Sequence, residues 1–158
     1  MFNIVLVHPE IPPNTGNVIR LAANTGCALH LIEPLGFSME DRHMRRAGLD
    51  YHEYATLHRH ADWDCFVQHA QPAPDRMFAL TTRGSTPVHH VAFQPGDWLV
   101  FGSETSGLPE AVWEQFAPTQ RLRLPMREGQ RSLTSPTQWR WWCMKLGDNR
   151  GLVIRRNA

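Results

Sequence analysis

The sequence predicts an α/β fold in which a parallel sheet is flanked by helices. Two observations support this prediction: short apolar runs recur along the chain, and segments with a helical pattern separate them. Such alternation is typical of parallel sheets, whose strands are buried on both faces. With 158 residues, 42% of them hydrophobic, the chain is long enough for one domain with a substantial core and too short for two ordinary ones.

The opening segment has the pattern of a strand, a turn and a helix. Residues 2–7 alternate and are rich in Ile and Val, as a strand would be. A Pro-Pro-Asn-Thr-Gly run at 12–16 interrupts this pattern. Asn17 is a suitable N-cap for a helix that reaches Thr25 and ends at Gly26.

The alternation continues to residue 124. Further strands are expected at 28–32, 54–57, 77–81, 97–101 and 121–124, and further helices at 40–47, 60–70 and 109–116. Pro109 suits the first turn of the last of these helices.

Three segments that follow predicted strands have an unusual composition. Residues 9–20 contain Pro-Pro-Asn-Thr-Gly-Asn, residues 100–109 contain Gly-Ser-Glu-Thr-Ser-Gly, and residues 124–133 contain Leu-Pro-Met and Arg-Ser-Leu. The two glycines of the second segment let a ligand approach the main chain, although a tight turn would explain that segment alone. Because ligands bind beyond the carboxyl ends of parallel strands, the three segments together predict one ligand site.

These motifs resemble those of the SPOUT-class RNA ribose methyltransferases, in particular the TrmL-like group that 2'-O-methylates the wobble nucleotide of tRNA. The resemblance covers residues 1–133 and extends to Ile32-Glu33-Pro34, residues 45–53 and residues 79–82. It implies a SPOUT-type fold with a C-terminal trefoil knot, a homodimer, S-adenosyl-L-methionine as cofactor and the tRNA anticodon stem-loop as partner.

The resemblance also implies catalytic roles for Arg20, Asn14 and Glu104. Arginine has a pKa above about 12, so Arg20 is expected to stabilise the developing alkoxide and not to act as a base. Asn14 would position the loop or the ribose, and Glu104 would orient the cofactor loop or Arg20. The structural alternatives are a helix-surface arginine and a carboxylate at a helix N-terminus.

Cofactor and RNA contacts are implied in the same way. Leu80, Gly102, Leu124 and Ser132 match the cofactor-binding positions. A formal net charge of +1 argues against a polycationic protein, so RNA binding would depend on local patches. The predicted contacts are Arg42, Arg45, Arg46 and Arg131, with a solvated surface as the alternative.

The sequence lacks the motifs that are typical of several other classes of site. GxGxxG and GxSxG are absent, which argues against a dinucleotide site and a hydrolase nucleophile. The chain has nine histidines. His58 and His60 are two residues apart and His89 and His90 are adjacent, and neither pair has a Cys or carboxylate at ligand spacing. We therefore expect surface histidines and no metal.

The three cysteines are far apart and suggest no disulfide framework. Without a long apolar stretch or signal peptide, a cytoplasmic protein without membrane contact is expected.

The resemblance stops after Leu133, and residues 134–158 are predicted to be a frameshifted tail that replaces the family's final helix. Trp and Met have single codons, so the alternative frame is forced in part. When the last base of each codon is read together with the first two bases of the next codon, Trp141-Trp142 and Trp142-Cys143 each encode Val, and Met144-Lys145 encodes Glu. The result, Val-Val-Tyr/His-Glu, resembles the family's final helix. A Trp-rich tail that stacks on RNA is the alternative.

The predicted function is therefore 2'-O-methylation of the ribose at tRNA position 34, on C or modified U. The alternatives are a non-catalytic RNA-binding remnant or inactive methyltransferase, and a ribosomal RNA 2'-O-methyltransferase.

Overall fold

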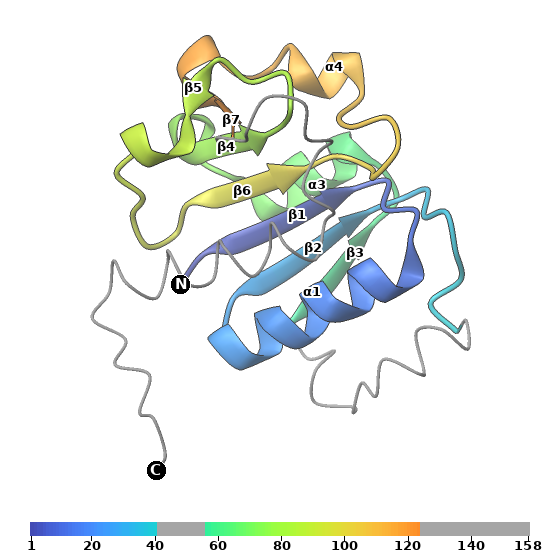
Figure 1. Cartoon of the computed structure of the whole chain (residues 1–158). Coiled ribbons are helices and arrows are strands. Elements are labelled where there is room, and N and C mark those ends of the chain that lie inside the picture. Colours follow the sequence, from blue (N-terminus) through green and yellow to red (C-terminus); the bar gives the residue numbers. More distant parts are fainter. Residues whose placement is uncertain (41–55, 124–158) are drawn as a thin grey trace.

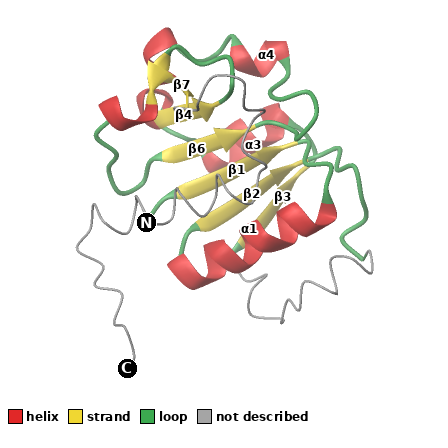
Figure 2. Cartoon of the chain, viewed as in Figure 1, coloured by secondary structure: helices red, strands yellow, loops and turns green. Residues whose placement is uncertain are grey.

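The computed structural model describes residues 1–40 and 56–123 of the chain. Their seven strands form one parallel sheet in the order β3-β2-β1-β6-β4-β7-β5, which confirms the predicted parallel α/β fold (Figures 1 and 2). The strands are β1 Asn3–Val7, β2 Ala28–Ile32, β3 Leu57–His60, β4 Met77–Leu80, β5 Thr86–Pro87, β6 Trp98–Phe101 and β7 Arg121–Arg123. The α-helices are α1 Pro12–Thr25, α3 Trp63–Ala70 and α4 Glu110–Trp113, and 3-10 turns lie at Pro74–Arg76, Val88–His90 and Pro118–Gln120.

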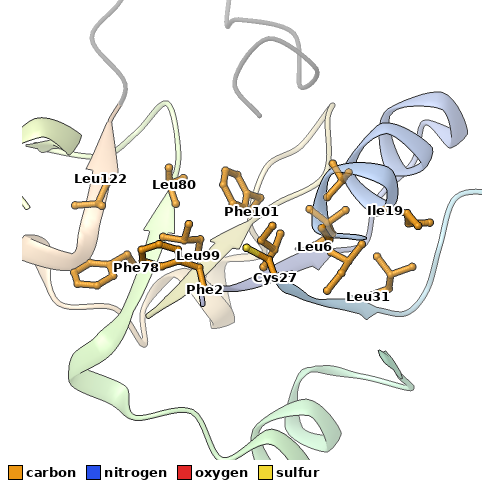
Figure 3. Packing of buried hydrophobic residues seen from close by; sticks show 14 of the residues in the cluster. Phe2, Leu6, Ile19, Cys27, Leu31, Phe78, Leu80, Leu99, Phe101 and Leu122 are labelled. Carbon is orange, nitrogen blue, oxygen red and sulfur yellow. The ribbon is translucent and has the colours of Figure 1, made fainter. Parts of the chain in front are cut away.

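Alternate residues of the central strands face two separate cores. One core lies under α1 and includes Leu6, Ile19, Leu31 and Phe101 (Figure 3). The other core lies on the opposite face, where residues of α3 and α4 pack on alternate residues such as Val5. Because side chains alternate along a strand, this two-sided burial produces the continuous apolar runs seen in the sequence.

Helix α1 begins five residues before the predicted N-cap Asn17, so that prediction was wrong. Ile11 is the N-cap residue, and prolines occupy the first two helical positions. The fixed φ of proline suits the first turn, where the missing N–H has no helical acceptor, and the Pro-Pro run therefore starts the helix. The predicted end is confirmed: Gly26 has a φ of 69° and its N–H bonds to the Ala22 carbonyl.

Two neighbouring elements begin later in the chain than predicted, and the second of them ends at Ala70 as predicted. β3 runs to His60 because it pairs with β2 up to Ile32. The following helix then begins at Trp63, where the Asp62 carboxylate accepts a hydrogen bond of 2.7 Å from the Cys65 N–H. α4 is shorter than predicted, and Pro109 is its N-cap.

The predicted helix at 40–47 lies outside the described residues apart from Glu40, as do position 124, the C-terminal tail and the segment on which the knot prediction depends. Within the described part of the chain, no helix is long and apolar enough to cross a membrane.

Candidate active site

The loops that follow β1 and β6 meet at the carboxyl edge of the sheet. β1 and β6 are adjacent parallel strands, and Leu6 pairs with Phe101. Adjacent parallel strands end at the same edge of the sheet, so the first two unusual segments come into contact there. In this contact Glu10 meets Glu104, which lies 94 residues further along the chain. This contact was the expected consequence of a parallel sheet.

The Glu104 carboxylate joins the β6 loop to the beginning of α1. It accepts hydrogen bonds from the Glu10 N–H at 2.8 Å, the Ile11 N–H at 3.4 Å and the Asn14 side-chain Nδ2 at 3.3 Å. Ile11 has no side chain that caps the helix. Glu104 therefore supplies a negative group at a helix N-terminus that lacks a capping side chain of its own, where the helix dipole favours it.

A reciprocal contact runs in the opposite direction between the same two loops. The Glu10 carboxylate accepts hydrogen bonds from the Thr105 hydroxyl at 2.6 Å and from the Thr105 N–H at 3.3 Å. Sequence analysis did not identify this pair, because nothing in the spacing of two residues 95 apart marks them as partners. Together the two carboxylates fix the approach of α1 to the β6 loop.

The β6 loop is a narrow hairpin that only glycine permits at its base. Ser103 and Gly107 exchange two backbone hydrogen bonds of 3.1 Å each. A Cβ on Gly102 would collide with the backbone of Gly107 and Leu108, and Gly107 itself has a φ of 73°. The predicted cofactor residue Gly102 therefore keeps its backbone in a fixed position at the strand end.

Leu80 lies at the end of the neighbouring strand. It pairs with Phe101 of β6 and with Leu122 of β7, and only 8% of its surface is exposed. The turn after it packs closely on β7, because a Cβ on Gly84 would lie 2.6 Å from the Leu122 carbonyl carbon. The structure thus brings Leu80 and Gly102 to the ends of adjacent strands.

The chain matches the model of the SpoU rRNA methylase family over residues 1–134. It belongs to that family. It is 68% identical over 133 residues to a tRNA (cytidine(34)-2'-O)-methyltransferase of Burkholderia pseudomallei, covering 84% of this chain and 85% of the relative. A second enzyme of that name, from a Polaromonas species, is 67% identical and is covered over 81% of its length. The predicted family is therefore confirmed.

Solved structures share the fold. One, described as structural insights into the 2-OH methylation of C/U34 on tRNA, has a TM-score of 0.81 and 37% identity, with 95% of this chain and 98% of that chain covered. An AdoMet-bound rRNA methyltransferase from Sinorhizobium meliloti has a TM-score of 0.77 at 19% identity, with 97% and 57% covered, and shows the fold alone.

In this SpoU-family chain the structure places some predicted site residues and not others. Asn14 and Glu104 are in contact, and Arg20 is exposed six residues further along the same helix. The predicted positions outside the described residues are Arg42, Arg45, Arg46, Leu124, Arg131 and Ser132.

The histidines depart from the expected surface positions. His58, His89 and His90 are exposed, but His30 and His60 are each only 7% exposed, so the prediction was wrong for both of these residues. Burial, with smaller contributions from His58 and His60, lowers the pKa of His30 to about 3. Burial, followed by His58 and His69, also lowers the pKa of His60. Both rings are therefore neutral at pH 7.

Proposed function

We propose that this chain transfers a methyl group from S-adenosyl-L-methionine to the ribose 2'-hydroxyl of tRNA nucleotide 34. One observation carries the proposal: Asn14 and Glu104 are held together at the carboxyl edge of the sheet, in a chain 67–68% identical to relatives named tRNA (cytidine(34)-2'-O)-methyltransferases. The solved structure concerned with C/U34 supports cytidine or uridine as the target.

The described part of the site fits the proposed cofactor. S-adenosyl-L-methionine supplies a sulfonium methyl group that is already activated for transfer. Leu80 and Gly102 would hold it at adjacent strand ends, where Gly102 presents main chain without a side chain. Leu124 and Ser132 are proposed to complete the set from the segment that follows β7.

In the proposed reaction the ribose oxygen forms a bond to the methyl carbon as the carbon–sulfur bond breaks, and the hydroxyl proton leaves. Arg20 donates hydrogen bonds to the oxygen as negative charge develops on it. Asn14, which Glu104 holds in place, positions the ribose. A tRNA phosphate accepts the proton, because the arginine side chain has no acceptor.

The experiment is methyl transfer from labelled S-adenosyl-L-methionine to tRNA, followed by mapping of the modified nucleotide. A matched tRNA carries 2'-deoxyribose at nucleotide 34, and a control tRNA carries it at a neighbouring anticodon nucleotide. We expect the first substitution to abolish transfer and the second to preserve it. Transfer to the tRNA without the 34 hydroxyl, or to ribosomal RNA alone, would contradict the proposal.

The partners follow from the same proposal. Arg42, Arg45, Arg46 and Arg131 are proposed to contact the phosphates of the anticodon stem-loop. The protein is proposed to act as a homodimer in the cytoplasm, where tRNA is its substrate. Sedimentation analysis of the purified chain, with and without tRNA, measures the dimer directly, and a monomer in both conditions would remove that part of the proposal.

We also propose that residues 134–158 are a frameshifted tail. Support comes from the extent of the matches, which end at residue 134 for the family and span 133 residues in the two relatives named above. Resequencing the gene and weighing the expressed protein test this proposal. An intact mass that matches the present sequence, together with full affinity for S-adenosyl-L-methionine, would contradict a damaging frameshift.

A further inference from the structure

Histidines from two strands and one helix gather on the face of the sheet opposite α1. His30 in β2 and His58 in β3 stack with ring centroids 4.8 Å apart, and His30 and His60 stack at 5.2 Å. α3 covers this face (Figure 1) and adds Cys65 and His69. The catalytic machinery proposed above lies at the strand ends and on α1, so this cluster has no part in it.

Three of these side chains converge on one point. Potential ligand atoms of His60, Cys65 and His69 all lie within 4.8 Å of one another. Cys65 and His69 are four residues apart on α3, which puts them on one helix face, and the Cys65 Sγ lies 3.2 Å from the His69 Nδ1. Around a tetrahedral zinc ion, neighbouring nitrogen and sulfur ligands lie about 3.5 Å apart. The helical pair already has nearly this separation.

We propose that His60, Cys65 and His69 bind a divalent transition-metal ion, with Zn²⁺ the best match. Two imidazole nitrogens and one thiolate suit zinc, whereas calcium and magnesium take oxygen ligands. Three protein ligands leave the fourth tetrahedral position for water.

The surroundings of His60 fit the role of a ligand. Its ring is buried against Phe66, with centroids 5.4 Å apart, and its Nε2 lies 3.0 Å from the His30 Nδ1. Metal-binding histidines are commonly oriented by a second hydrogen bond of this kind. His60 is thus held in place, and Cys65 and His69 on the more accessible helix surface complete the site. The bound ion would join α3 to the edge strand β3.

Full-length protein freed of metal by a chelator tests the site with Zn²⁺ and Co²⁺ as probes. Zinc affinity is measured by competition with a chromophoric chelator, and Co²⁺ reports a thiolate ligand through its charge-transfer absorption. The variants Cys65→Ser and His69→Gln change side chains outside the apolar core. His89→Gln is the matched control, because His89 is exposed and lies outside the cluster.

We expect one zinc ion per chain, at least about a tenfold loss of affinity in each ligand variant, and no loss in the control. The Co²⁺–thiolate absorption should disappear in Cys65→Ser, and Zn²⁺ should raise the Tm of the parent protein and not of the ligand variants. Absence of zinc binding, or equal binding by parent and ligand variants, would overturn the proposal. Because the readouts are metal affinity and Tm, failure here leaves the methyltransferase proposal untouched.

Discussion

The two faces of the sheet are built from different side chains. The α1 face is dominated by aliphatic residues such as Leu6, Ile19 and Leu31, and the candidate site residues lie on α1 and in the loops at the edge of the sheet. The α3 face contains Trp63 and Phe66 and also buries His30. The α1 face therefore has a candidate site at its edge, whereas titratable side chains are buried within the core of the α3 face. Substitutions on each face should accordingly change different properties.

The largest effect is expected at Arg20 on the α1 side. Arg20→Ala should lower kcat for tRNA methylation by at least about 10²-fold, because it removes the donor proposed to act on the charge that develops in the transition state. Affinity for S-adenosyl-L-methionine should stay within a few-fold. Single-turnover methyl transfer and calorimetry measure the two quantities. The control is Asn24→Ala, an exposed residue of the same helix, and full activity in Arg20→Ala would remove Arg20 from the mechanism.

Glu104 should affect both activity and stability, since it connects the β6 loop with α1. Glu104→Ala removes the acceptor for three hydrogen bonds and should lower the free energy of unfolding by about 1.5–3 kcal/mol. We expect kcat/KM to fall at least tenfold as Asn14 loses its position. Urea denaturation and steady-state kinetics measure these changes. Glu110→Ala, which breaks an exposed pair with Arg83, is the control and should cost less than about 1 kcal/mol.

The sequence predicted the central strands of the sheet better than its edge strands. Runs such as residues 77–81 and 97–101 identified buried strands because both faces are covered. β3 is polar and lies at one edge, and β5 has only two residues, so neither has the pattern of a buried strand. Edge strands such as these are defined by their backbone pairing with a neighbouring strand, and the local sequence pattern does not reveal that pairing.

The candidate site shows the same division. The resemblance proposed Asn14 and Glu104 as site residues, but it did not predict the hydrogen bond between them, which joins residues 90 apart and forms only in the folded sheet. The His60 cluster was missed for a related reason. Two of its members, Cys65 and His69, have a recognisable helical spacing. The third, His60, belongs to β3 and lies next to them only because the chain folds that way.

A smaller effect tests whether a local positive charge contributes to tRNA binding. Replacing Arg45 and Arg46 together by Ala should weaken tRNA binding by about tenfold and reduce the salt slope by about two, because each phosphate contact releases counterions. Binding measured over a range of salt concentrations gives the slope. Arg59→Ala, at an exposed arginine paired with Glu33, is the control, and an unchanged slope in the double variant would identify the pair as ordinary surface.

The smallest effect near neutral pH is expected on the α3 face, where stability should depend on protonation. The pKa of His30 is about 3 in the folded protein and about 6.5 in an unfolded chain. Between these values the unfolded chain binds a proton that the folded protein does not. The free energy of unfolding should therefore fall as the pH decreases from 6.5 towards 3, by at most about 1.4 kcal/mol per pH unit for this group. His60 acts in the same direction, because its pKa is also lowered.

His30→Gln separates this effect from packing. The lost packing lowers stability equally at every pH, whereas removal of the titrating ring reduces the slope below pH 6.5. Urea denaturation between pH 7 and about 5, with a chelator present to exclude metal, measures both. His89→Gln is the matched control, because His89 is exposed and lies outside the histidine cluster. An identical pH dependence in His30→Gln and the parent would show that the α3 face does not differ from the α1 face in this respect.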